Sequence, residues 1–118
     1  MGINKDLLKY TAIESFNADY AQGWTTTRGQ SNNNTGEEGQ LLSEEFTLNT
    51  THSILKIYCE RRCRIGFYDE SGGVNGNNSL RVEEAKVHEF PIPSGATHFV
   101  VRGDYSEDAN RYFYITTG

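Results

Sequence analysis

Short segments in which apolar and polar residues alternate follow one another through most of this chain, and they constrain its fold more than any other feature. In residues 53–59, for example, Leu55 and Ile57 fall on one face of a strand while Tyr58 falls on the other. Successive side chains of a strand point to opposite faces, so this pattern is typical of half-buried strands. Comparable segments occupy residues 22–28, 42–48, 63–68, 79–82, 87–92, 97–102 and 111–117. About eight short strands predict an all-β chain, an antiparallel β-sandwich of jelly-roll type.

The apolar faces of these segments are expected to meet in one core between two sheets. The residues expected to fill it are Phe46, Leu55, Ile57, Ile65, Phe67, Phe99, Val101, Phe113 and Ile115. Pro91 and Pro93 cannot donate to a β-ladder, which places them at a strand edge or a strand entry. Residues 29–39 are polar, rich in glycine and without period, so a loop is expected there.

The N-terminal segment, residues 1–16, allows two interpretations. Leu8, Ala12 and Phe16 recur at four-residue spacing, which suits a short helix capped by Asn4, but a strand over residues 10–16 fits as well. In either form we expect an apolar lead-in that anchors the sandwich domain, residues 17–118, to a partner. The expected anchor residues are Ile3, Leu7, Leu8, Ile13 and Phe16.

Composition excludes several classes of function. A chain of 118 residues forms one domain. It carries 11 basic and 16 acidic residues, a net charge of −5, and neither half is basic, so no nucleic-acid partner is expected. There is no apolar run long enough for a membrane span or a signal peptide, so we expect a soluble protein with no secretion signal of its own and no membrane partner.

None of the reactive residues forms a recognisable catalytic or metal-binding pattern. Cys59 and Cys63 lack two further zinc ligands at suitable spacing, and we expect two buried thiols, although a disulfide across a tight turn is geometrically possible. Residues 69–73 have the Asp and Gly that a hairpin turn needs, which we favour over a calcium loop. Adjacent carboxylates such as Glu83 and Glu84 point to opposite faces of a strand. We therefore expect no enzyme, no metal and no cofactor.

Aromatic side chains on the faces opposite the core are the best candidates for binding. Sugar rings stack their C–H faces on aromatic rings, and their hydroxyls need polar partners. If the protein binds a ligand, we expect a shallow carbohydrate site of weak affinity. Its predicted members are Trp24, Tyr68, Arg102, Asp104 and Tyr105.

Two motifs resemble a known module. Residues 67–72 (FYDESG) and residues 90–101 (FPIPSGATHFVV) are similar to a jelly-roll domain, like a carbohydrate-binding module, found in tailed-phage virion proteins and bacterial surface hydrolases. The resemblance implies a non-enzymatic virion surface or structural protein of a tailed bacteriophage, such as a capsid decoration, head-fibre or tail-associated module. Its partners would be other virion proteins, as a homo-oligomer or docked on the capsid or tail, and a host cell-surface glycan. The alternative is a carbohydrate-binding accessory module of a bacterial cell-surface hydrolase, located on the cell surface or secreted.

Overall fold

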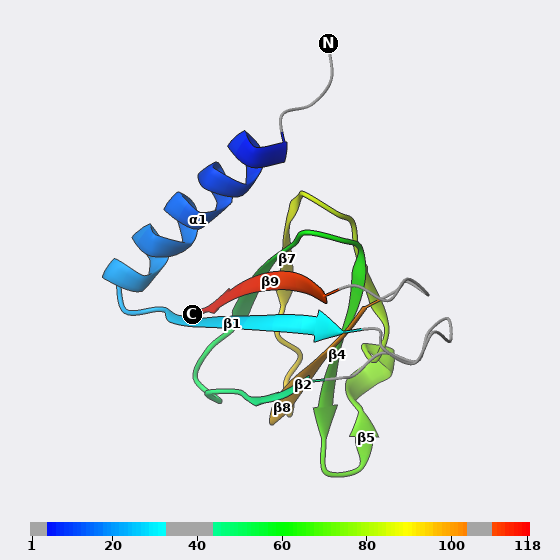
Figure 1. The fold of residues 1–118 in the computed structure, drawn as a ribbon. Helices are drawn as coiled ribbons and strands as arrows, with labels where there is room; N and C mark the ends of the chain where they lie inside the picture. The colour runs from blue at the N-terminus through cyan, green and yellow to red at the C-terminus, as the bar shows by residue number, and fades with distance from the viewer. Residues whose placement is uncertain (1–4, 33–43, 104–109) are drawn as a thin grey trace.

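Two antiparallel sheets pack face to face, and one helix lies against the outside of the first sheet (Figure 1). The computed structural model describes residues 5–32, 44–103 and 110–118. The helix α1 spans Lys5–Ala21. The strands are β1 (Thr25–Asn32), β2 (Glu44–Thr47), β3 (Ile54–Cys59), β4 (Cys63–Asp69), β5 (Gly72–Gly73), β6 (Leu80–Val82), β7 (Val87–Pro91), β8 (His98–Gly103) and β9 (Asn110–Thr117), with a 3₁₀ turn at Val74–Gly76. The prediction of a mostly β, antiparallel sandwich is confirmed.

The strand order is that of a jelly roll. Sheet A runs β1-β9-β3-β7, and sheet B runs β2-β8-β4-β5 with β6 also paired to β4. The chain thus folds as one long hairpin, in which β1 pairs with β9, β2 with β8, β3 with β7 and β4 with β6. The β3–β9 and β4–β8 pairings then wind that hairpin into two sheets.

The core lies between the two sheets and contains the residues that the alternation predicts. Leu55, Ile57, Ile65 and Phe67 are completely buried there. Phe99, Val101, Phe113 and Ile115 are buried in the same cluster, and Phe46 packs against it. The Phe46 ring stacks on the Phe99 ring with their centroids 5.0 Å apart, joining β2 to β8.

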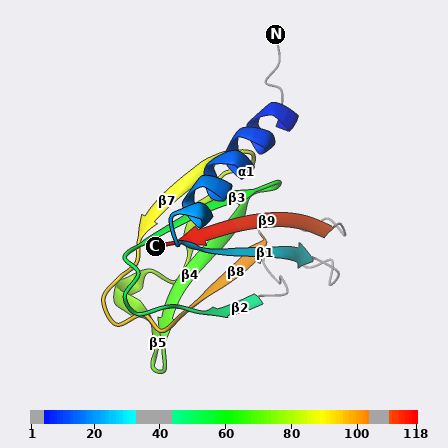
Figure 2. The same ribbon diagram turned by 90° about the vertical axis from the view of Figure 1, so that its left-hand side faces the viewer.

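The ambiguous N-terminal segment is a helix. Ala12 and Phe16, one turn apart, are buried against Tyr58 on the outer face of sheet A. The helix extends through Ala21, beyond the expected boundary at residue 16. Gly23 ends it with a φ of 94°, while the amide of Trp24 donates to the carbonyl of Asp19, as in a Schellman motif. Figure 2 shows α1 lying on the side of β9 and β1, away from sheet B.

The turns follow the expectations with one exception. Gly72, at a φ of 129°, closes the tight β4–β5 hairpin, where the Ser71 amide donates to the Asp69 carboxylate at 2.7 Å. Pro91 ends β7, which lies at the edge of sheet A and needs no donor on its open side. The exception is the loop expected at residues 29–39. Its first four residues belong to β1, which pairs with β9 as far as Asn32, so the ladder overrides the local preference of glycine and asparagine for turns.

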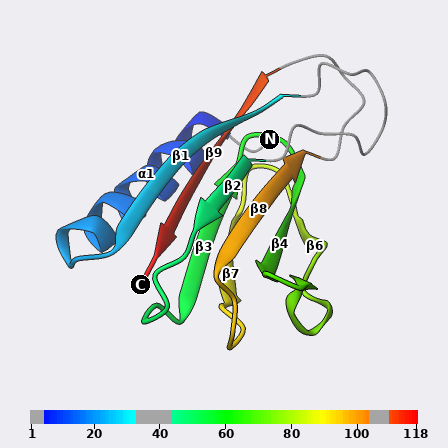
Figure 3. The ribbon, with the colours of Figure 1, turned by 90° about the horizontal axis from the view of Figure 1, so that it is seen from below.

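The arrangement gives the sandwich two outer faces of different kinds. Seen from below, α1 lies beside β1 and β9, and sheet B with β4 and β6 lies on the other side (Figure 3). We call the outer surface of sheet A the covered face and that of sheet B the open face. Within the described ranges, no helix is long and apolar enough to cross a membrane.

Candidate functional site

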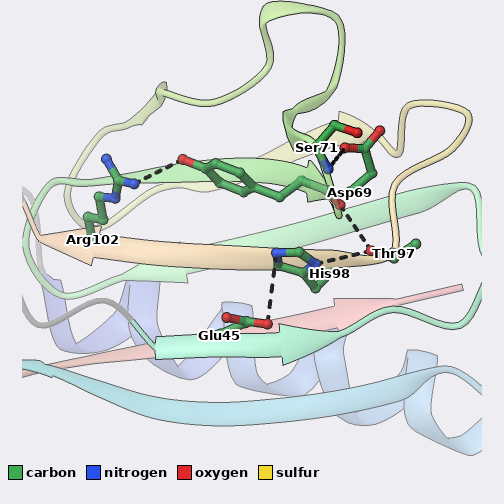
Figure 4. A network of polar contacts seen from close by, with 7 residues as sticks. Glu45, Asp69, Ser71, Thr97, His98 and Arg102 are labelled. Carbon is green, nitrogen blue, oxygen red and sulfur yellow. Dashed lines mark hydrogen bonds and ion pairs between the residues drawn. The ribbon is translucent and has the colours of Figure 1, made fainter.

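Tyr68 is the centre of the candidate site on the open face. It lies on β4, between the inward-pointing Phe67 and the hairpin turn, and its ring is half-buried. Its hydroxyl accepts a hydrogen bond from Arg102 Nη2 at 3.0 Å and donates to the carbonyl oxygen of Asn78 at 3.2 Å. On its other side the His98 ring is stacked nearly parallel, at 15° and 5.7 Å between centroids. Figure 4 shows Arg102 and His98 on β8, along the open face.

Gly66 allows the Tyr68 ring to lie in this position. A Cβ at residue 66 would come within 2.6 Å of Tyr68 Cε2 and 2.8 Å of the Asn78 carbonyl oxygen. Both approaches are shorter than a real Cβ tolerates, so the space over residue 66 is available to the ring only because glycine has no side chain. The order Gly66, Phe67, Tyr68 therefore fixes one ring in the core and leaves the next one flat on the outer face.

His98 links the ring to the edge strand of the open face. Its Nδ1 lies 3.0 Å from the Thr97 hydroxyl, and its Nε2 lies 3.8 Å from a carboxylate oxygen of Glu45 on β2 (Figure 4). The Thr97 amide donates to the Tyr68 carbonyl at 2.9 Å, which ties the start of β8 to β4. Aromatic rings, hydroxyls and an exposed carboxylate are thus held together on one rigid surface. These are the groups that recognise a sugar: ring faces for its C–H bonds and polar atoms for its hydroxyls.

The structure divides the predicted carbohydrate site. Tyr68 and Arg102 are neighbours on the open face, but Trp24 lies at the covered face, where Lys56 Nζ sits 5.3 Å from its ring centroid. A side chain at Gly118 would collide with the Trp24 ring, so that ring packs on the C-terminal end of the chain. Asp104 and Tyr105 lie outside the described residues. Trp24 thus belongs to a different surface from Tyr68.

The expected anchor residues lie on α1 and are of two kinds. Phe16 is buried against the protein's own sheet, and Ile13 is half-buried beside it. Leu7 and Leu8 are exposed, and Ile3 lies outside the described residues. Tyr10 and Tyr20 on the same helix are also exposed, 63% and 66% accessible. Part of the expected anchor therefore fixes the helix to sheet A, and part remains on the surface.

Two ion pairs fasten α1 to the covered face. Lys56 on β3 binds Asp19 at 2.8 Å in a pair whose two side chains are 16% and 17% exposed. Lys9 binds Glu60 at 3.0 Å, and this hydrogen bond raises the pKa of the lysine, although partial burial opposes the shift. Grooves run along both sides of the helix. One is lined by Ile13, Phe16, Asn17, Tyr20, Thr26, Thr27, Tyr114 and Ile115, the other by Leu8, Thr11, Ala12, Ser15, Lys56, Tyr58, Ala85, Lys86, Val87 and Glu89.

Cys59 and Cys63 are both free and buried, at the end of β3 and the start of β4. Burial raises the pKa of the Cys59 thiol well above its ordinary value, and a hydrogen bond with Cys63 adds to the effect. A buried thiol with a raised pKa is a poor nucleophile because the reactive form is the thiolate. In the part of the chain that the structure describes, no three His, Cys, Asp or Glu side chains are grouped so that they could hold a metal ion.

Sequence reasoning identified Tyr68 and Arg102 but missed their neighbours. His98, Gly66 and Asn78 join the site because β8 pairs with β4 and because the chain returns over β4 after the hairpin. One local signal was available: alternation places His98 on the same side of β8 as Arg102, opposite Phe99 and Val101.

Comparisons with known proteins bear on the fold alone. No protein-family model matches the chain, and no curated protein matches it. Among solved structures, the chain is similar to a de novo designed double-stranded β-helix, with a TM-score of 0.51 and 14% identity over 80% of this chain and 99% of that one. A structure of Bacillus endospore appendages, described as a novel family of disulfide-linked pili, matches at 13% identity over 80% of this chain and 87% of that one. Its TM-score of 0.33 is too low to indicate a shared fold.

Proposed function

We propose that this chain is a non-enzymatic surface module of a tailed-phage virion that contacts a host glycan through the open face. The observation that carries the proposal is the Tyr68 ring, fixed across β4 by Arg102, Asn78 and His98. An aromatic ring that is already immobilised loses little conformational freedom when a sugar stacks on it. The two motifs that resemble phage virion modules include Tyr68 and lead into His98, so the resemblance and the geometry concern the same face.

The covered face supports the second half of the proposal, attachment to a larger particle. Leu7, Tyr10 and Tyr20 expose large apolar surfaces on α1, and grooves flank the helix. Exposed apolar surface of this kind is typical of a surface that meets another protein. The module would be fixed through α1 and would present the open face outward, since the two lie on opposite sides of the sandwich.

Titration with host cell-wall polysaccharides tests the glycan contact. Tyr68→Ala should weaken binding by roughly 5- to 150-fold, since removing a stacked ring costs on the order of 1–3 kcal/mol. The control is Tyr10→Ala, which removes a more exposed tyrosine ring from α1 and should leave the affinity unchanged. If the wild type binds no polysaccharide, or if both variants bind equally well, the proposed contact is wrong.

Two observations test whether the protein belongs to a phage virion. One is mass spectrometry of purified particles, and the other is the identity of the genes that surround its coding sequence. Capsid and tail genes next to this one, and the protein in the particles, would support the virion. A contiguous hydrolase domain would favour the alternative that the resemblance also allows, an accessory module of a bacterial cell-surface enzyme. That outcome would leave the proposed glycan contact on the open face standing, but it would overturn the proposal that the protein belongs to a virion.

A further inference from the structure

The edges of the two sheets are protected unequally. Short length, charges and proline are the usual devices that keep a sheet edge from pairing with another chain. The strands at the edges of sheet B, β2, β5 and β6, have only four, two and three residues, and β7, at one edge of sheet A, carries Glu89 and Pro91. β1, the other edge of sheet A, has eight residues that pair with β9 without a bulge. It contains no proline, no acidic residue and a single charge, Arg28.

The free side of β1 is accessible where the strand begins. Among the described strands, β1 ends the order of sheet A, so its backbone groups that point away from β9 have no ladder partner there. Thr25 and Thr26 are exposed, and Thr27 is half-buried. The helix does not close off this end of the strand, because an open hollow of about 650 Å³ lies beside it. That hollow is lined by Tyr20, Ala21, Gly23, Trp24, Thr25 and Thr26.

The sequence of this edge suits pairing with a second copy of itself. In an antiparallel pair centred on Thr26, that residue faces its own counterpart, and Thr25 of each copy faces Thr27 of the other. Cross-strand threonine pairs stabilise a sheet, whereas like charges directly opposite each other destabilise it. Arg28 falls opposite residue 24 of the other copy in this register, so the two arginines do not face each other.

Charge also favours this edge over the rest of the surface. The chain has a net charge of −5, so two copies repel each other in most approaches. Residues 20–36, which include β1, contain no Asp or Glu and form the longest stretch of the sequence without one. The carboxylate that precedes this stretch, Asp19, is paired with Lys56 at 2.8 Å. Contact through β1 therefore brings few unpaired carboxylates together.

We infer that two copies of this chain associate through β1, antiparallel about a two-fold axis near Thr26, so that sheet A continues from one copy into the other. The axis of such a pair is perpendicular to the sheet, because opposite residues share a face. Both helices then lie on one side and both open faces on the other. This inference does not depend on the proposed glycan contact. It would place two such contacts side by side, which raises the apparent affinity of a weak site.

Sedimentation of the whole chain over a concentration series tests the association. A contact made mainly by one strand is small, so we expect a monomer–dimer equilibrium with a Kd on the order of 10–100 μM. Thr26→Lys places two lysines opposite each other at the axis and should weaken the dimer about tenfold. Thr47→Lys, the same exchange at an exposed position of the edge strand β2, is the matched control and should change the Kd less than twofold. Circular dichroism of both variants reports whether the fold is retained.

A cysteine at the axis tests the register without adding a charge. Thr26→Cys places two thiols directly opposite each other, with Cβ atoms about 4.5–5.5 Å apart, near the separation that a disulfide spans. With oxidised glutathione, this variant should form a covalent dimer. Thr47→Cys and the wild type, whose Cys59 and Cys63 are buried, should remain monomeric on a denaturing gel.

Each claim can fail separately. A wild type that stays monomeric at every concentration would overturn the pairing, and so would equal effects of Thr26→Lys and Thr47→Lys or equal cross-linking of the two cysteine variants. A trimer or an open polymer would overturn it as well, because an antiparallel pair of edges closes at two copies. None of these results bears on polysaccharide binding, which is measured by titration.

Discussion

The covered face and the open face are outer surfaces of the same sandwich, yet they use their outward side chains differently. On sheet A, Tyr58 packs under Ala12 and Phe16 of the helix, and Lys56 is paired with Asp19. On sheet B, the outward positions carry arginines, Tyr68 and His98, and the helix that covers sheet A lies away from them.

Burial accounts for this difference. A sheet face that a helix covers needs apolar contacts and satisfied charges, because an unpaired charge is costly away from water. A face open to water tolerates a row of like charges and half-buried rings. Substitutions on the covered face should therefore change the free energy of unfolding, and those on the open face should change binding instead.

The largest effect is expected from Phe16→Ala. Phe16 is 5% exposed between the helix and sheet A, and its truncation removes a buried ring and leaves a cavity. We expect the free energy of unfolding to fall by about 3 kcal/mol, measured by chemical denaturation. Tyr68→Ala on the open face is the comparison and should cost less than about 1 kcal/mol. Equal losses would mean that burial does not distinguish the two faces.

The next prediction concerns the coupling energies of two ion pairs, which double-mutant cycles measure. Lys56 and Asp19 are largely buried under the helix, whereas Arg81 and Glu83 are about half exposed. We expect a coupling energy of about 1–2 kcal/mol for the first pair and below about 0.5 kcal/mol for the second. Thermal unfolding of the single and double variants gives both values. A larger coupling at the exposed pair would contradict the argument from burial.

The fold was largely predictable because strand alternation is a local property. Leu55, Ile57, Ile65 and Phe67 face inward on the strands where the sequence predicts it. Helix and strand could not be separated in residues 4–16, because the contacts that decide between them come from Tyr58, far along the chain.

The site was predictable only in part, for a similar reason. Tyr68 and Trp24 are both aromatic residues on strand faces expected to be polar. The sequence around each of them does not show that they lie on opposite faces of the sandwich. The pairing of Arg64 with Arg81 and with Arg102 depends on β4 lying between β6 and β8, which is a property of the strand order and not of any one segment.

A smaller effect should come from Thr116→Val. Thr116 lies on β9, completely buried, and its hydroxyl has no hydrogen-bond partner among the described residues. Valine has nearly the same shape and removes the polar group, so the free energy of unfolding should rise by about 1 kcal/mol. Thr47→Val, at an exposed position on β2, is the matched control and should change it by less than about 0.5 kcal/mol. Destabilisation by Thr116→Val would show that the hydroxyl has a partner under the helix.

The smallest effect is a pH dependence of stability that we expect from a histidine on β7, the edge strand of sheet A. His88 on β7 stacks on Phe90, and its Nε2 accepts a hydrogen bond from the Glu83 amide at 3.0 Å, which requires an unprotonated nitrogen. Burial lowers the pKa of His88 below its ordinary value, and the positive charge of Lys86 adds to the shift, while Glu83 opposes it.

Because the unfolded chain binds this proton at a higher pH than the folded chain does, the contribution of His88 to stability is complete above about pH 6.5 and is lost as pH falls through the lowered pKa. Thermal unfolding of the wild type should show this loss, smaller than the change from Thr116→Val because the ring is partly exposed. In His88→Gln, whose side-chain oxygen can still accept from the Glu83 amide, the acid-side decline should flatten. An unchanged decline in that variant would assign the pH dependence to other groups.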